Sequence, residues 1–316
     1  MNPEPDVIGR AAAVVRAGGL VAFPTETVYG LGASGLSAGA VSGIFRAKGR
    51  PATNPLILHI ADASEVSNVA AGWPATAQSL ADRFWPGPLT LVVPKRGSVP
   101  DIVTAGGPTV AVRCPNHPVA RALIRASGVP LAAPSANRST ELSPTRAEHV
   151  LKGLNGRVEI VLDGGPCPGG LESTVVDVTG ETPRVLRPGL ITAPMLAEVC
   201  GPVEVGAREG DGVARAPGQM VKHYSPRTPI RLIGGDDLVD DLHEARLADR
   251  CVGVLTFSWP NLPTNLSDDP ARAAALLYDA LHRMDQAGFD HLLVEMPPEA
   301  PEWAAVRDRL TRAAAQ

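Results

Sequence analysis

Polar side chains that could hold a polyanionic ligand follow several short apolar runs of the chain. His59 ends the run that begins at Leu56, and Arg113 ends the run that begins at Thr109. Strand ends on one edge of a sheet converge on a crevice, and fixed cations and donors there can neutralise charge on phosphate. The pattern predicts a site for a polyanion with a small polar co-substrate. The other members of this set are the cations Lys48, Arg50 and Arg187 and the hydroxyl or amide groups of Thr27, Asn54, Ser135, Asn137, Ser143 and Ser173.

The densest part of this set lies between Phe23 and His59. Lys48 ends a segment with helical apolar spacing, and Gly49 and Pro51 are typical of a helix end. Alone, Lys48 or Arg50 would be read as an ordinary helix C-terminal cation. Together they indicate two cations on a loop, which an anion could bridge.

Each remaining polar residue has a structural alternative. Thr27 is also a plausible turn residue, and Arg113 alone would be expected to reach solvent. Ser135 and Asn137 could cap a following helix instead of meeting a ligand. Ser143 is expected to cap a helix that has Pro144 at its first position and runs to residue 154.

Composition limits the class of protein. The chain has 316 residues, a formal net charge of −4, and four widely spaced cysteines without a CxxC pair. This argues against a broad nucleic-acid footprint, a zinc ribbon or a disulfide framework. No signal peptide or membrane span is expected, so we predict a reduced, cytoplasmic protein. Phosphate-binding motifs of the GxxxxGK[ST] and GxGxxG types are absent.

The apolar pattern predicts an α/β protein in two parts. Strands are expected at residues 20–23, 56–60, 89–93, 109–113, 129–133, 158–162, 175–178 and 183–187, with helices at 6–17, 74–85, 116–127 and 192–200 among others. Residues 201–228 are rich in Gly, Pro and charge, so we expect an interdomain linker there. Regular strand and helix alternation beyond it predicts a small parallel layer. The expected division is 1–200 for the first domain, 201–228 for the linker and 229–316 for the second.

A resemblance adds to what the spacing predicts. The ordered motifs PTETVYGLG, AKGRPATNPL, FWPGPLTLV, VAVRCPNHP, PSANRST and LESTVVD with RPG resemble those of the YrdC-like domain of threonylcarbamoyl-AMP synthases. The stretch APGQMVKHYSP and the α/β segment after it resemble the long, two-domain form of that family. The resemblance implies a YrdC-like twisted mixed sheet, a linker that acts as a lid, and a small Rossmann-like parallel domain.

The resemblance also implies a reaction. L-Threonine, bicarbonate and ATP would give threonylcarbamoyl-AMP and pyrophosphate, the first step toward threonylcarbamoyladenosine in tRNA, with Mg²⁺ on the ATP phosphates. The product would pass to the tRNA threonylcarbamoyl-transfer machinery, and strong direct tRNA binding is not expected. By motif match, threonine would be held by Thr27, His59, Arg113, Ala133 and Ser173. ATP would be held by Lys48, Arg50, Asn54, Thr109, Ser135, Asn137, Ser143, Arg187 and Tyr224, with Lys48 and Arg50 as the catalytic cations.

Two other functions fit parts of the pattern. An RNA-binding or ribosome-maturation module could use the same concave surface, although the acidic balance argues against it. A carbamoyl-transfer enzyme for metallocentre maturation has this domain type, but the chain lacks paired CxxC motifs and further catalytic domains. A carbamoyl-AMP product would favour that last function.

Overall fold

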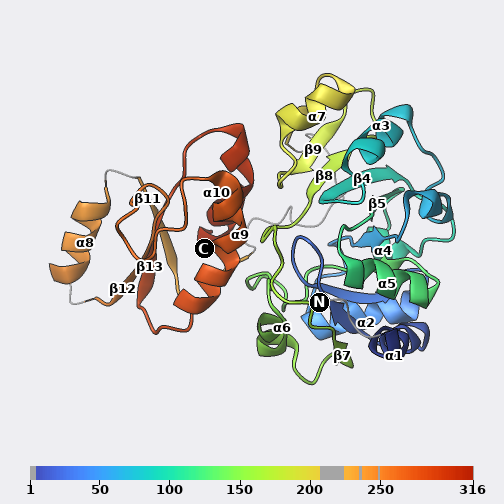
Figure 1. The fold of residues 1–316 in the computed structure, drawn as a ribbon, viewed down its shortest axis with the longest axis horizontal. Helices are drawn as coiled ribbons and strands as arrows, with labels where there is room; N and C mark the ends of the chain where they lie inside the picture. Colours follow the sequence, from blue (N-terminus) through green and yellow to red (C-terminus); the bar gives the residue numbers. More distant parts are fainter. Residues whose placement is uncertain (1–4, 207–223, 235–236, 248–249, 316) are drawn as a thin grey trace.

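Two sheets of different size organise the chain in the computed structural model (Figure 1). The structure describes residues 5–206, 224–234, 237–247 and 250–315. The larger sheet lies in the first two hundred residues and the smaller one beyond residue 229. This confirms the predicted α/β fold. Most of the expected linker, residues 207–223, lies outside the described residues.

The larger sheet is mixed and has the strand order β10-β9-β8-β4-β5-β3-β6-β2-β1-β7. Its strand β3 runs parallel to β5, whereas β4 runs antiparallel to β5 and parallel to β8. The strands are β1 (Val21–Phe23), β2 (Gly30–Ser34), β3 (Ile57–His59), β4 (Leu89–Pro94), β5 (Thr109–Arg113), β6 (Leu131–Ala132), β7 (Ile160–Val161), β8 (Thr174–Asp177), β9 (Arg184–Arg187) and β10 (Glu204–Val205).

Helices cover both faces of this sheet because successive strand side chains point to opposite faces. Val21 and Phe23 of β1 belong to a buried cluster with residues of α1 and α5, whereas Ala22 belongs to the cluster on the other face, which also contains residues of α2, α3 and α7. The helices α4 and α6 and the 3₁₀ turn η1 are short. Their bounds are α1 (Pro5–Arg16), α2 (Ala38–Lys48), η1 (Ala63–Asn68), α3 (Ala75–Phe84), α4 (Asp101–Thr104), α5 (Pro118–Ser127), α6 (Ala147–Leu154) and α7 (Ala193–Cys200).

The smaller sheet has three parallel strands in the order β11-β13-β12. Its helices α9 and α10 lie between this sheet and the larger part, and α8 lies on the far side (Figure 1). Leu277 of α9 and Leu310 of α10 share one buried cluster with Leu142 and Leu171 of the larger part. The two parts therefore share a core. The elements are β11 (Ile230–Ile233), α8 (Leu238–Leu247), β12 (Val252–Leu255), α9 (Pro270–Met284), β13 (His291–Glu295), η2 (Pro301–Trp303) and α10 (Ala304–Ala314).

Some local predictions differ from the structure. The strand β2 was not expected, because its sequence Gly-Leu-Gly-Ala-Ser has the glycines that strands disfavour. The helix expected from Pro144 begins at Ala147, with Arg146 as its N-cap residue. Pro144 is instead held beside the site, where its carbonyl accepts a hydrogen bond from the Tyr29 backbone N–H at 2.8 Å. The first residues of the expected linker form β10, which pairs with β9.

None of the helices in the described part of the chain has the length and apolar character needed to span a membrane.

Candidate active site

A pocket opens where the ends of four neighbouring strands of the larger sheet meet. His59 at the end of β3 pairs in register with Arg113 at the end of β5, and Arg113 pairs with Thr90 near the start of β4. Parallel pairing of β4 with β8 brings Ser173 to the same edge. The predicted site residues that line this pocket are Thr27, Arg50, His59, Arg113, Ala133, Ser135, Ser173, Arg187 and Tyr224.

One side of the pocket is built around Arg113, which is buried. Its Nη1 donates to Thr27 Oγ1 at 3.0 Å, and its Nε donates to Gly87 O at 3.3 Å. Its Nη2 lies 2.7 Å from Glu26 Oε1, an ion pair without hydrogen-bond alignment. Thr25 Oγ1 donates to Val28 O, so the Thr27 hydroxyl proton points to Thr25 at 2.8 Å. Arg113 is thus held by protein acceptors. The alternative expectation, that Arg113 alone would reach solvent, is wrong.

His59 lies beside Arg113 and is neutral at physiological pH. Burial, and then the Arg113 charge, lower the pKa of His59 to about 3. Among the described residues, its Nδ1 has no hydrogen-bond partner. A neutral imidazole with an unused ring nitrogen can form a hydrogen bond with a ligand but cannot act as an acid at neutral pH.

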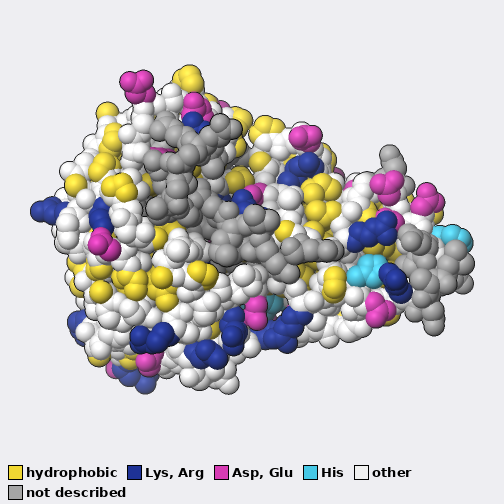
Figure 2. Space-filling view, turned by 180° about the vertical axis from the view of Figure 1, so that it is seen from behind, with side chains coloured by type: hydrophobic (Ala, Val, Ile, Leu, Met, Phe, Trp, Pro, Cys, Tyr) yellow, Lys and Arg dark blue, Asp and Glu magenta, His cyan; other side chains and the backbone are white. Residues whose placement is uncertain are grey.

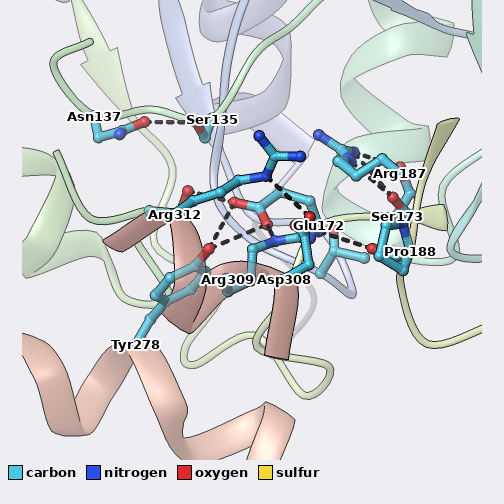
Figure 3. Close-up of polar contacts among 12 residues, drawn as sticks. Ser135, Asn137, Glu172, Ser173, Arg187, Pro188, Tyr278, Asp308, Arg309 and Arg312 are labelled. Atoms are coloured by element: carbon cyan, nitrogen blue, oxygen red, sulfur yellow. Dashed lines mark hydrogen bonds and ion pairs between the residues drawn. The ribbon is translucent and has the colours of Figure 1, made fainter. Parts of the chain in front are cut away.

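The other side of the pocket carries two buried guanidinium groups. Arg50 donates from Nε to Asn54 O at 3.2 Å and from Nη2 to Pro55 O at 2.9 Å. Burial and the nearby Arg187 charge lower the pKa of Arg50 to about 10, although Tyr224 opposes the shift. Arg187 donates from Nε and Nη2 to Ser173 O at 3.2 and 3.0 Å (Figure 3). Two like charges held close together favour an anion between them.

Lys48 supports the pocket without lining it. Its Nζ donates to the backbone carbonyls of Ser135 and Asn137 and to Asn137 Oδ1 at 3.1 Å. Burial and the Arg50 charge hold the pKa of Lys48 well below its usual range. The expected arrangement, with both cations free on a loop, is therefore wrong for Lys48. Gly49 does end the helix, at φ 64°.

Asn54, Asn137 and Ser143 lie behind the residues that line the pocket. Asn54 contributes its carbonyl to Arg50, and Asn137 Oδ1 accepts from Ser135 Oγ. Ser143 Oγ donates to Glu172 Oε1, so it is not the helix cap that its sequence suggested. Thr109 lies at the opposite end of β5 from Arg113 and does not line the pocket.

Glu172 is a pocket residue that sequence reasoning missed. It is 6% exposed, and its carboxylate meets Arg309 Nε of α10 at 2.8 Å and Tyr278 OH of α9 at 3.3 Å (Figure 3). Burial would raise the pKa of Glu172, but Arg309, Arg187 and Ser143 together lower it to about 2. In the sequence, its position directly before Ser173 was the only indication that Glu172 lies at the pocket.

Tyr224 closes the pocket from the end of the expected linker. It is 1% exposed, lies under Arg309 with 5.1 Å from ring centroid to guanidinium carbon, and has a left-handed backbone at φ 62°. Its ring centroid lies 5.9 Å from that of Tyr278. Tyr224 and the smaller part therefore meet at the pocket wall.

Comparisons with known proteins cover nearly the whole chain. A family model described as "Telomere recombination" matches residues 13–189, and one described as "Threonylcarbamoyl-AMP synthase, C-terminal domain" matches residues 191–315. The threonylcarbamoyl-AMP synthase of Bacillus subtilis is 42% identical over 97% of this chain and 92% of that protein. That of Pyrococcus abyssi is 42% identical over 96% of this chain and 92% of that protein. The crystal structure of P. abyssi Sua5 complexed with L-threonine superposes with a TM-score of 0.93 at 42% identity, covering 99% of this chain and 96% of that one.

Proposed function

This chain belongs to the threonylcarbamoyl-AMP synthase family, and we propose that the pocket at the strand ends is its active site. The enzyme makes threonylcarbamoyl-AMP and pyrophosphate from L-threonine, bicarbonate and ATP. The observation that carries the assignment is that one pocket is lined by two groups of side chains. Arg113, His59 and Thr27 form one, and Arg50 and Arg187 form the other.

The Arg113 side suits L-threonine. A guanidinium can pair with the amino-acid carboxylate, and the Thr27 hydroxyl beside it offers its remaining lone pair as an acceptor. Neutral His59 can form a hydrogen bond with the substrate without adding a second charge. Ser173 and the backbone at Ala133 complete this side, since both line the same pocket.

The Arg50 and Arg187 side suits the phosphates of ATP. Two guanidinium groups can each bind a phosphate through two donors. Ser135 and Tyr224 line the pocket on this side, and Lys48, Asn54, Asn137 and Ser143 hold its loops through the contacts described above. Thr109 lies away from the pocket, so its role in ATP binding stays a prediction.

The two sides support a reaction in two steps. The threonine amine attacks bicarbonate and loses water, which gives an N-carboxylate. An oxygen of that carboxylate then attacks the α-phosphate of ATP, and pyrophosphate leaves with the electron pair of the broken P–O bond. Arg50 and Arg187 stabilise the charge that develops on the phosphates. The buried ring of Tyr224 helps to exclude water from a product that water would hydrolyse.

Magnesium enters this proposal with ATP rather than as a resident ion. Among the described residues, no cluster of three or more His, Cys, Asp or Glu side chains could hold a metal. Of the residues that the structure describes, Glu172 is the one carboxylate that lines the pocket, and it is paired with Arg309. Mg²⁺ typically keeps several waters and binds through substrate phosphates. Mg·ATP is therefore the expected form of the substrate.

The wider proposal concerns the division of the chain and its partners. We divide it into a catalytic domain at 1–200, a linker and lid at 201–228, and a small domain at 229–316. All four cysteines are free, in keeping with a cytoplasmic location. On the face drawn in Figure 2, Lys and Arg side chains gather along the lower edge with some Asp and Glu among them. The formal net charge of −4 fits transfer of the product to a separate tRNA-modifying enzyme better than strong tRNA binding.

Product analysis tests the proposed function. The enzyme is incubated with Mg·ATP, ¹³C-bicarbonate and L-threonine, with L-serine in a parallel reaction, and the nucleotides are analysed by mass spectrometry. A ¹³C-labelled adenylate that contains threonine is expected. Carbamoyl-AMP formed without threonine would contradict the proposal.

A further inference from the structure

A buried ion pair joins the smaller domain to the active-site loop. Arg309 is fully buried on α10, and its Nε donates to Glu172 Oε2 at 2.8 Å. Its Nη2 donates to Pro188 O at 3.1 Å, and its Nη1 meets Asp308 Oδ2 at 2.6 Å (Figure 3). One side chain of the smaller domain thus contacts two loops that flank the pocket, at residues 172 and 188.

We infer that Arg309 is a positioning residue for the synthase reaction, which acts through Glu172 and Ser173 on the ATP-binding guanidinium of Arg187. This inference rests on the proposed function of the pocket. It adds a role for the smaller domain beyond support of the lid, because a residue of that domain sets the geometry of a phosphate-binding group.

The connection from Arg309 to Arg187 consists of short contacts. Glu172 and Ser173 are adjacent, so anchoring the Glu172 carboxylate restrains the peptide between them. The Ser173 carbonyl accepts two hydrogen bonds from Arg187, at 3.2 and 3.0 Å. The loop at residue 189 leaves little room for movement, since a Cβ on Gly189 would lie 2.7 Å from Ser173 C. A shift of Glu172 would therefore be passed on to Arg187.

Independent contacts show that the smaller domain is fitted to this loop. Gly170 has φ +71°, and a Cβ there would lie 2.5 Å from Ala275 Cα of α9. A side chain at this position would separate α9 from the loop. Tyr278 of α9 also reaches the Glu172 carboxylate, at 3.3 Å. Helix α9 and helix α10 therefore converge on the same carboxylate.

The threonine side of the pocket is held without Arg309. Ser173 Oγ lies 2.7 Å from Thr90 Oγ1 of β4 and also accepts from Arg187 Nη2 at 3.2 Å, whereas Arg113 is held by Thr27 and Gly87. All of these contacts lie within the larger domain. Loss of Arg309 should therefore impair ATP use more than threonine binding, because Ser173 is the one threonine-side residue through which Arg309 acts.

The test compares two substitutions on one helix. Arg309→Met removes the contact with Glu172. Arg307→Met is the matched control, because Arg307 is also on α10 but donates to Pro297 O within the smaller domain. The full-length variants are assayed for kcat and KM with Mg·ATP, for L-threonine Kd by calorimetry without ATP, and for Tm.

We expect Arg309→Met to lower kcat/KM for Mg·ATP by at least about tenfold, since small misplacement of a catalytic group is costly. The L-threonine Kd should stay within about threefold, and Arg307→Met should match the wild type in both. The inference would be overturned if Arg309→Met had the same kcat/KM for Mg·ATP as Arg307→Met. It would also be overturned if Arg309→Met lost threonine affinity by as large a factor as it lost kcat/KM for Mg·ATP. Absence of synthase activity in the wild-type enzyme would instead contradict the proposed function.

A second variant separates positioning from stability. Arg309→Met leaves an unpaired buried carboxylate, and Arg309→Met combined with Glu172→Gln removes that charge as well. The double variant should recover Tm while its kcat/KM for Mg·ATP stays low. Recovery of activity together with Tm would show that Arg309 only stabilises the fold. If Arg309→Met does not fold, the double variant is compared with Arg307→Met in its place.

Discussion

Lys48 Nζ lies 3.1 Å from Asn137 Oδ1 and also donates to the backbone carbonyls of Ser135 and Asn137. The cation that the sequence placed at the reaction centre therefore holds the loop that carries Ser135. We expect its contribution to catalysis to follow from the position of that loop, and its contribution to stability to follow from the Ser135 and Asn137 carbonyls, which would lose a buried donor.

We predict that Lys48→Met lowers both stability and turnover. Buried acceptors that lose their donor cost about 1–3 kcal/mol in the free energy of unfolding. Turnover should fall roughly a hundredfold, because the loop that carries Ser135 loses its anchor and a small misplacement of a binding group is costly. Urea unfolding and pyrophosphate release measure the two effects. Lys95→Met is the control, because Lys95 forms its ion pair with Asp101 away from the pocket. Unchanged turnover in Lys48→Met would remove Lys48 from the mechanism.

Buried His59 predicts acid sensitivity of the fold. Its folded pKa is about 3, below the unfolded value near 6.5, so below pH 6.5 the unfolded state binds a proton that the folded state does not. Stability should therefore fall as pH decreases from 6.5 toward 3. The limiting slope for one such group is about 1.4 kcal/mol per pH unit. We expect unfolding free energies of His59→Asn to fall less steeply than those of the wild type between pH 6 and 4. Equal slopes would contradict a neutral, buried imidazole.

The larger domain is predicted to fold alone but to work poorly. A fragment of residues 1–206 keeps the whole ten-stranded sheet, including β10, and the clusters on both of its faces. It lacks Tyr224 and Arg309, and it exposes Leu142 and Leu171 to solvent. Its turnover should be at least about tenfold below that of the full chain. Circular dichroism and pyrophosphate release provide the measurements, and full activity in the fragment would rule out a role for the lid and the smaller domain.

Much of the frame of the site was predictable from sequence. Apolar runs that end in His59 and Arg113 identified β3 and β5, and parallel pairing then places both side chains on one edge. The small parallel domain followed from strand and helix alternation. These features depend on local pattern, which a sequence carries directly.

The remaining features depend on packing between distant segments. Arg309 and Glu172 are 137 residues apart, and nothing in the spacing of either indicates the other. Ser143 had a good capping pattern, but the buried Glu172 carboxylate takes its hydroxyl. Lys48 was expected to face a ligand, whereas carbonyls of a later loop surround it. In each case a tertiary partner outweighed a local preference.

We propose that one pocket binds threonine at Arg113 and the ATP phosphates at Arg187. The most direct test is calorimetric binding of L-threonine and of Mg·ATP to Arg113→Lys and Arg187→Lys, which keep the charge but lose the guanidinium fork. A lost charge-assisted hydrogen bond is worth about 1.5–3 kcal/mol, so affinity should fall by at least about tenfold. We expect Arg113→Lys to weaken only threonine binding and Arg187→Lys to weaken only ATP binding. Loss of the same ligand in both variants, or of neither, would contradict the assignment.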